Sequence, residues 1–260
     1  MKKKYMHKLL PKLFHILNYD TFHGKIFSFL VSLFQMIKIF ICRPSLKWFS
    51  LFKLVFIVKP FYSQLSAQRL LNLYRLGEEV NALGLKGDVV ECGVWNGGSA
   101  AMIARGLDMH KSLTSRNIWL FDSFEGLPQP TERDDKQNNK YYFEGVCTGN
   151  EKNVDMIFNK MNISKERVKI VKGWIKDTFL NTKIEEISLL HVDMDWFDSI
   201  ELVLEHFYEN VVKGGFVVID DYYTLQGCHD AVNSFLKRKN LQDSVDIIKV
   251  DWNGVYFCKP

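Results

Sequence analysis

The sequence lacks paired cysteines. Its five cysteines lie far apart in the chain, and no two of them form a Cys-x-x-Cys pair. This spacing excludes the disulfide framework of small secreted domains and gives no sign of a zinc site. We therefore expect a cytoplasmic protein whose thiols stay reduced.

Long hydrophobic runs are also missing. The longest uncharged run in the first 60 residues covers 26–37, which is shorter than the roughly 20 residues that span a bilayer, and Lys38 follows it. A secretory signal peptide fits badly, because Pro11 interrupts the early apolar region and no small-residue cleavage site follows. The sequence therefore predicts neither a membrane span nor a signal peptide here.

Acidic residues are scarce in the same region. Residues 1–60 hold eleven lysines and arginines against the single acid Asp20, whereas the rest of the chain holds 23 basic and 29 acidic residues. An attraction to anionic surfaces is therefore expected only at the N-terminus, and we expect no nucleic-acid partner. Residues 1–65 form a basic, apolar, helical segment with two interpretations. One is peripheral contact with the inner face of an anionic membrane; the other is packing on the rest of the chain or on a second subunit of a homo-oligomer.

The glycine-rich stretch 87–99 is the first motif that carries chemistry. A short apolar run leads into Glu91, a glycine turn and a helix start. The spacing is Gly-x-x-x-Gly-Gly, so it matches neither the dinucleotide fingerprint nor a Walker loop with its lysine. A glutamate at the strand end suits a ligand with a positive amino group or sulfonium better than a pyrophosphate. The stretch favours S-adenosylmethionine over NAD, with an ordinary β–α turn as the alternative.

A second strand is expected at residues 117–121, ending on Asp122. In doubly wound sheets ligands bind at the carboxyl ends of strands, and an acid after the second strand commonly holds ribose hydroxyls. Asp122 is thus placed for an adenosine ribose. Residues 129–153 are polar and predict a long loop or lid.

The remaining pattern predicts an α/β fold. We expect a mainly parallel, seven-stranded, Rossmann-like sheet with an antiparallel C-terminal hairpin around Asn253-Gly254, behind an N-terminal helical segment. Trp174, after the third strand, is either a stacking partner for adenine or a core residue. The other strands are expected at 167–172, 187–192, 216–219, 245–252 and 255–258, and helices at 66–85, 199–212 and 227–239, the second helix ending at Lys213-Gly214-Gly215.

Carboxylates follow the fourth and fifth expected strands: Asp193 and Asp195 in the first case, Asp220 and Asp221 in the second. One helix joins these strands, so their carboxyl ends should converge. Carboxylates gathered there repel one another unless a cation lies between them, and oxygen ligands suit Mg²⁺. A carboxylate or His191 would then accept the proton of a metal-bound hydroxyl. Alternatively, the paired aspartates begin a loop, Asp195 caps the next helix, and His191 is structural.

Together these motifs resemble the macrocin-type (TylF-like) O-methyltransferases. The resemblance implies a class I methyltransferase fold over residues 66–260, S-adenosylmethionine as donor, and magnesium-dependent transfer to a sugar hydroxyl, often on a glycosylated natural product. It rests on 87–99, 122–128, Gly173-Trp174 with Asp177-Thr178, Asp193-Met194-Asp195 and Asp220-Asp221-Tyr222.

The resemblance also implies roles for individual residues. Asp193, Asp220 and Asp221 would hold the metal, and Asp193 would also accept the proton. Donor-binding residues would be Glu91, Gly93 and Asp122, with their neighbours Val94, Gly97, Ser99, Ser123 and Phe124 and with Gly173 and Trp174.

Two other functions stay open. The same donor site would also serve transfer to a small phenol or another hydroxylated metabolite, so the acceptor is expected to be a small or glycosylated molecule. A non-catalytic, membrane-attached protein that only binds through a methyltransferase-like domain is the second alternative. The intact acidic and glycine positions argue against it.

Overall fold

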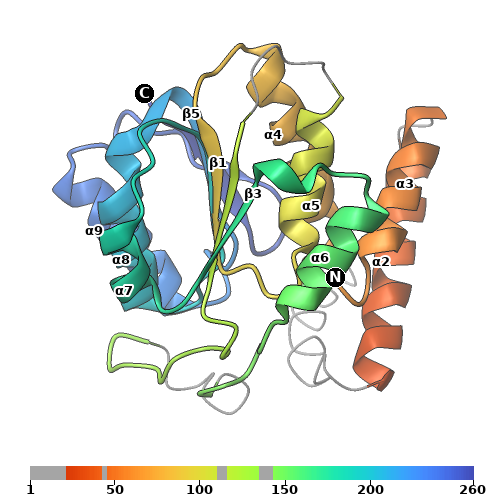
Figure 1. Cartoon of the computed structure of the whole chain (residues 1–260), viewed down its shortest axis with the longest axis horizontal. Coiled ribbons are helices and arrows are strands. Elements are labelled where there is room, and N and C mark those ends of the chain that lie inside the picture. The colour runs from red at the N-terminus through yellow and green to blue at the C-terminus, as the bar shows by residue number, and fades with distance from the viewer. Residues whose placement is uncertain (1–21, 43–45, 110–115, 135–142) are drawn as a thin grey trace, which may run out of the picture.

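A seven-stranded sheet forms the centre of the computed structural model, which describes residues 22–42, 46–109, 116–134 and 143–260 (Figure 1). The strand order is β3-β2-β1-β4-β5-β7-β6. The first five strands in this order are parallel, and β7 pairs antiparallel with both β5 and β6. This confirms the predicted sheet and its antiparallel end. The strands are β1 (Asp88–Cys92), β2 (Ile118–Asp122), β3 (Val168–Lys172), β4 (Ile187–Val192), β5 (Val211–Ile219), β6 (Ile248–Lys249) and β7 (Val255–Cys258).

Helices cover both faces of the sheet (Figure 1). Successive strand residues point to opposite faces, so Val89 joins the core beneath α4 and α5, whereas Val90 joins the core beneath α8 and α9. The helices are α2 (Phe22–Cys42), α3 (Leu46–Val58), α4 (Ala67–Ala82), α5 (Gly98–Leu107), α6 (Glu151–Lys160), α7 (Ile175–Thr178), α8 (Phe197–Phe207) and α9 (Gln226–Arg238).

Strand β5 begins earlier than the sequence predicts. The expectation that Gly214 and Gly215 end a helix is wrong, because both glycines lie inside the strand. The Gly214 N–H donates to the carbonyl of Lys259 at 2.8 Å, and the Lys259 N–H donates to the carbonyl of Gly215 at 2.9 Å. Pairing with the distant C-terminal strand thus overrides the local signal for a helix end.

Strand β6 and helix α6 also differ from expectation. The strand expected at 245–252 is reduced to Ile248–Lys249, the two residues that pair with β7. The polar loop expected up to residue 153 ends earlier, because the Asn150 side chain caps the helix by accepting from the N–H of Lys152 at 2.9 Å. Val154 and Ile157 are buried on its inner side. Residues 135–142 of the expected lid lie outside the described residues.

The described part of the N-terminal segment forms α2 and α3, and residues 1–21 of that segment lie outside the described residues. Helix α2 is longer than the uncharged run 26–37 on which the expectation of no membrane span rested, because its 21 residues continue through Lys38. Among the helices in the described ranges, only α2 is long and apolar enough, by length and composition, to cross a membrane. Only 22% of its most apolar stretch, within His23–Ile41, is buried in the protein. The domain boundary at residue 65 stays a prediction. The chain after α3 packs on the sheet domain, since the N–H of Gly98 donates to the Tyr62 carbonyl at 2.8 Å.

Candidate active site

The strand register brings the expected site residues together. Cys92 at the end of β1 pairs with Val192 on β4, which in turn pairs with Ile219 on β5. Three level strand ends therefore meet at one edge of the sheet, as expected for a doubly wound fold. The residues that follow them are Gly93, Asp193 and Asp220.

The glycine turn has the backbone that glycine permits. Gly93 and Gly97 have φ angles of +85° and +82°, in the left-handed region that side chains disfavour. The N–H of Gly93 donates to the Phe121 carbonyl at 2.9 Å and ties the turn to β2. Gly97 is the N-cap of α5 and makes no side-chain cap, and the N–H of Gly98 donates to the Tyr62 carbonyl. A polar ligand at this helix end would therefore have to use the N–H groups that follow Gly98.

Asp122 holds this turn in place. One carboxylate oxygen accepts from the N–H groups of Val94 and Trp95, at 2.7 and 2.8 Å, and the other accepts from Phe124 at 2.6 Å. Burial raises the pKa of Asp122 above its ordinary value, and these three amide bonds oppose that rise. A carboxylate has about four acceptor positions, so one remains for a ribose hydroxyl.

Glu91 lies beneath the turn rather than at its open side. It is fully buried, accepts a hydrogen bond from the Ser99 hydroxyl, and places Oε1 at 2.9 Å from Nδ1 of His191. Glu91 and Ser99 therefore support the start of α5 from inside the fold. Oε2 of Glu91 is buried and has no hydrogen-bond partner among the described residues.

The other expected donor-site residues lie beside Asp122 at the ends of β2 and β3. Gly173, with φ +136°, donates its N–H to the Asp122 carbonyl at 3.0 Å. Ser123 is buried and accepts from the N–H of Glu125, and Phe124 has a positive φ of 58°. Trp174 is half-buried and belongs to neither hydrophobic core, so the core interpretation loses support.

The carboxylates converge as expected, with one addition. Oxygens of Asp193, Asp195 and Asp221 all lie within 4.8 Å of one another, as do ligand atoms of His191, Asp193 and Asp220. Asp193 belongs to both groups, so it lies between the two candidate cation positions. The three carboxylates Asp193, Asp195 and Asp221 are hard oxygen donors that fit Mg²⁺, whereas the second group includes the imidazole nitrogen of His191.

Asp195 joins this cluster instead of starting the next helix. The N-cap of α8 is Trp196, which makes no side-chain cap, and the N–H of Phe197 donates to Asp134 at 2.8 Å. The sequence suggested the cap because Asp195 stands at the right spacing. A residue from the distant loop occupies that role, and Asp195, whose φ is +59°, lies beside Asp221.

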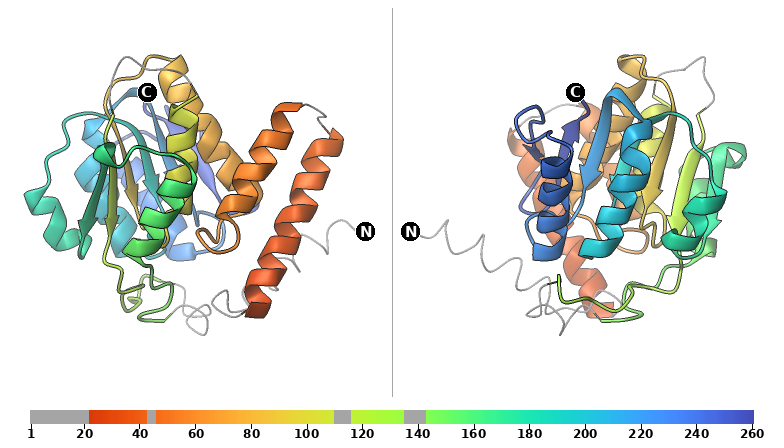
Figure 2. Two further views of the ribbon diagram at one scale, coloured as in Figure 1. Left: turned by 45° about the vertical axis from the view of Figure 1, so that its right-hand side comes forward. Right: turned by 90° about the vertical axis from the view of Figure 1, so that its left-hand side faces the viewer.

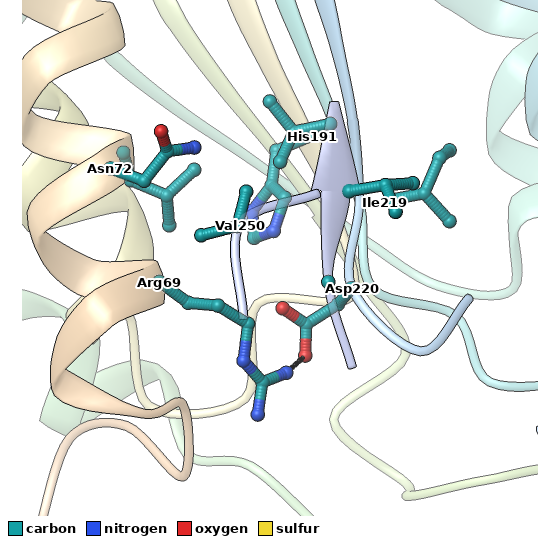
Figure 3. Close-up of a pocket in the computed structure, with 10 residues that line it drawn as sticks. Arg69, Asn72, His191, Ile219, Asp220 and Val250 are labelled. Atoms are coloured by element: carbon teal, nitrogen blue, oxygen red, sulfur yellow. Dashed lines mark hydrogen bonds and ion pairs between the residues drawn. The ribbon is translucent and has the colours of Figure 1, made fainter. Parts of the chain in front are cut away.

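Three residues at the cluster were not predicted from the sequence: Arg69, Asp251 and Asn253. Arg69 on α4 forms an ion pair with Asp220 (Figure 3). It forms a second ion pair, at 3.3 Å, with Asp251. Asn253 donates from Nδ2 to Asp221 at 2.6 Å. The Asn-Gly hairpin signal located Asn253 but said nothing of the direction of its side chain.

His191 is buried and structural in part. Its Nδ1 faces Glu91, whereas Nε2 has no hydrogen-bond partner among the described residues. Figure 3 shows it beside a small pocket whose lining includes Arg69, Asn72 and Asp220. His191 thus lies between Glu91, which supports the glycine turn, and the carboxylate cluster.

Burial and mutual repulsion make the cluster costly to charge. Burial, with Asp220 and Asp221 nearby, raises the pKa of Asp193 well above its ordinary value, and burial with the same neighbours does so for Asp195. Burial also raises the pKa of Asp220 to about 7, against the opposing effect of Arg69. A bound cation would relieve this repulsion.

We predict an unusual pH dependence for the stability of the metal-free protein. A carboxyl whose folded pKa is raised stabilises the fold below its unfolded pKa and loses that contribution as the pH rises through the folded value. In EDTA the melting temperature should therefore rise as the pH falls from about 8 to about 5. Each tenfold increase in the proton affinity of a carboxylate on folding corresponds to about 1.4 kcal/mol in the free energy of unfolding. Asp220→Asn should flatten this slope. A melting temperature that stays constant or falls over the range would contradict the prediction.

Comparisons with known proteins show the family of this chain. The family model of the macrocin O-methyltransferases (TylF) matches residues 59–259. The chain is 32% identical over 201 residues to mycinamicin III 3''-O-methyltransferase of Micromonospora griseorubida, covering 75% of this chain and 78% of that protein. It is 31% identical over 199 residues to 8-demethyl-8-(2,3-dimethoxy-alpha-L-rhamnosyl)-tetracenomycin-C 4'-O-methyltransferase of Streptomyces olivaceus, covering 75% of each chain.

A solved structure extends the agreement to the fold. The O-methyltransferase NovP is 29% identical, with a TM-score of 0.69 over 76% of this chain and 82% of NovP. This likeness confirms the expected class I methyltransferase fold. With its sequence match and its fold in agreement, the chain belongs to the macrocin O-methyltransferase (TylF) family of S-adenosylmethionine-dependent O-methyltransferases.

Proposed function

We propose that this enzyme methylates a hydroxyl of a sugar or a glycosylated metabolite, with a divalent cation such as Mg²⁺ at the carboxylate cluster. The observation that carries the proposal is the direct contact between the glycine turn and the cluster: Gly93 and Asp193 follow paired strand ends, and the Asp193 N–H donates to the Cys92 carbonyl at 2.9 Å. A methyl donor in the turn and an acceptor at the cluster would therefore be neighbours.

The chain's own residues have separate roles in this proposal. Asp122 and the glycine turn orient the donor, with Glu91 and Ser99 supporting the turn from below. Asp193, Asp195 and Asp221 would hold the cation, because their oxygens lie within 4.8 Å of one another, and Asp220 lies beside Asp193 in an ion pair with Arg69. When bound, the cation would lower the pKa of a coordinated hydroxyl.

Methyl transfer requires that the acceptor hydroxyl lose its proton. The acceptor oxygen forms a bond to the donor's methyl carbon while the sulfur–methyl bond breaks, which yields S-adenosylhomocysteine and the methyl ether. Asp193 accepts the hydroxyl proton, and Asp195 is a second carboxylate at the same place.

The sugar acceptor is supported by the relatives. One of them acts, by its name, on a rhamnosyl-tetracenomycin at a 4' position. A phenolic acceptor remains the competing proposal, because the same donor site would serve it.

An acceptor panel tests this choice. Wild-type enzyme is incubated with labelled S-adenosylmethionine, Mg²⁺ and either methyl rhamnoside, other simple glycosides or catechol. We expect label in a glycoside, above the background of an Asp193→Asn variant. Methylation of catechol with no transfer to any glycoside would favour the phenolic alternative.

A further inference from the structure

Helix α2 carries an apolar surface that the rest of the described chain does not cover. Figure 2 shows α2 and α3 at the outside of the molecule, beside the helices that cover one face of the sheet. The side chains that form this surface, called here the outer stripe, repeat every three or four residues along one side of α2. They are Ile26, Leu30, Phe34, Ile37 and Ile41, with exposed fractions of 43%, 53%, 65%, 48% and 72%.

The opposite side of α2 is fixed to the enzyme body. Ser28, Ser32 and Met36 are almost completely buried. Gln35 accepts a hydrogen bond from the N–H of Ala67, the first residue of α4, at 3.0 Å. These contacts hold the helix in one rotation about its axis, so the outer stripe faces away from the domain.

Aromatic contacts join α2 to α3. The rings of Phe29 and Phe56 lie 5.2 Å apart, and those of Phe40 and Phe52 lie 6.0 Å apart, which joins α2 to α3. At about 1.5 Å per residue the outer stripe runs for roughly 22 Å. Monomeric soluble proteins seldom expose an apolar surface of this extent without a partner.

The charge around the outer stripe identifies the partner. Residues 21–77 contain no aspartate or glutamate, and Lys25, Lys38 and Lys53 lie on α2 and α3. Two copies placed stripe to stripe would bring basic surfaces together with no acids from these helices to pair with them. Anionic lipid headgroups supply the opposite charge, and lysines near such a surface strengthen binding.

We propose that the outer stripe of α2 lies in the interface of an anionic membrane, parallel to its plane, with the enzyme body on the aqueous side. A monotopic helix of this kind buries one apolar face to the depth of the headgroup boundary. Although α2 is long enough to cross a bilayer, crossing would strip Ser28, Ser32 and Gln35 from the enzyme body. The in-plane orientation keeps these contacts.

Vesicle sedimentation of the full-length protein tests the proposal. The probes are vesicles of equimolar phosphatidylglycerol and phosphatidylcholine, and vesicles of phosphatidylcholine alone. We expect strong binding to the first and weak binding to the second, with the difference reduced by salt. Phe34→Glu/Ile41→Glu should lower the affinity for acidic vesicles at least tenfold and leave methyl transfer in solution unchanged.

A matched control separates the outer stripe from a general charge effect. Leu83→Glu/Leu180→Glu adds the same two charges at side chains that are 63% and 85% exposed outside α2 and α3. This variant should bind acidic vesicles nearly as well as wild type. Equal losses in the two double variants, or a wild-type protein that ignores acidic vesicles, would overturn the proposal.

Two further outcomes would also overturn it. If light scattering shows that Phe34→Glu/Ile41→Glu converts a dimer to a monomer without any vesicle binding, the outer stripe is an interface between copies. If detergent alone releases the bound protein, while high salt with alkaline carbonate does not, α2 crosses the bilayer instead of lying on it.

Discussion

Asp193→Asn is expected to lower methyl transfer by roughly 10²–10⁴-fold while donor affinity stays close to wild type. Sugar hydroxyls are very weak acids, so the nucleophile stays protonated unless nearby groups favour its ionised form. Asparagine keeps the shape of Asp193 but removes the charge shared by both groups of ligand atoms. EDTA should abolish transfer in the wild type and Mg²⁺ should restore it. Initial rates measure methyl transfer, and calorimetry with S-adenosylhomocysteine measures donor affinity.

Two further aspartate-to-asparagine variants test whether the loss of methyl transfer is specific to the carboxylate cluster. Asp243→Asn makes the same chemical change at an exposed residue and should be as active as wild type. Asp195→Asn should lose transfer to a similar degree as Asp193→Asn, because the structure places Asp195 in the cluster and not at the start of α8. Full activity in excess chelator, or an undiminished Asp193→Asn enzyme, would show that these carboxylates are not catalytic.

Gly93→Ala is expected to abolish donor binding and transfer together. Gly93 has a φ of +85°, and a Cβ built there would overlap the carbonyl oxygen of Asp193. The left-handed backbone and the forced overlap should together destabilise the fold by roughly 2–5 kcal/mol. The displaced backbone belongs to both the glycine turn and the carboxylate cluster, so one methyl group should damage both. Thermal unfolding and calorimetry with S-adenosylhomocysteine measure the two effects.

Gly84→Ala is the matched control for backbone strain. Gly84 also has a positive φ, +64°, but a Cβ there would meet no atom within 4 Å. It should lose only about 1–2 kcal/mol and bind donor normally. If Gly93→Ala does not fold, Asp122→Ala tests the turn without adding an atom, since it removes the acceptor for three N–H groups and should weaken donor binding. Normal donor affinity in either turn variant would contradict the assignment of this site.

Much of the sheet and the position of the site could be predicted from the sequence. Strand β4 has its expected bounds, Ile187–Val192, and the glycine turn after β1 lies where its spacing indicated. Such features are local, because apolar runs, glycines and strand-ending acids express backbone preferences within a few residues. The same local rules give no bounds for α2. An uncharged run ends at Lys38, whereas helical hydrogen bonds continue past it.

The chain by itself determined that acids follow β4 and β5 and that a parallel sheet would bring them to one edge. Only the tertiary structure decided how each acid is held: Arg69 pairs with Asp220, Asn253 binds Asp221, and Asp134 takes the helix-capping role that leaves Asp195 in the cluster. These partners lie from 32 to 151 residues away in the chain. The pairs exist only after distant elements pack, since no local propensity encodes which side chains then meet.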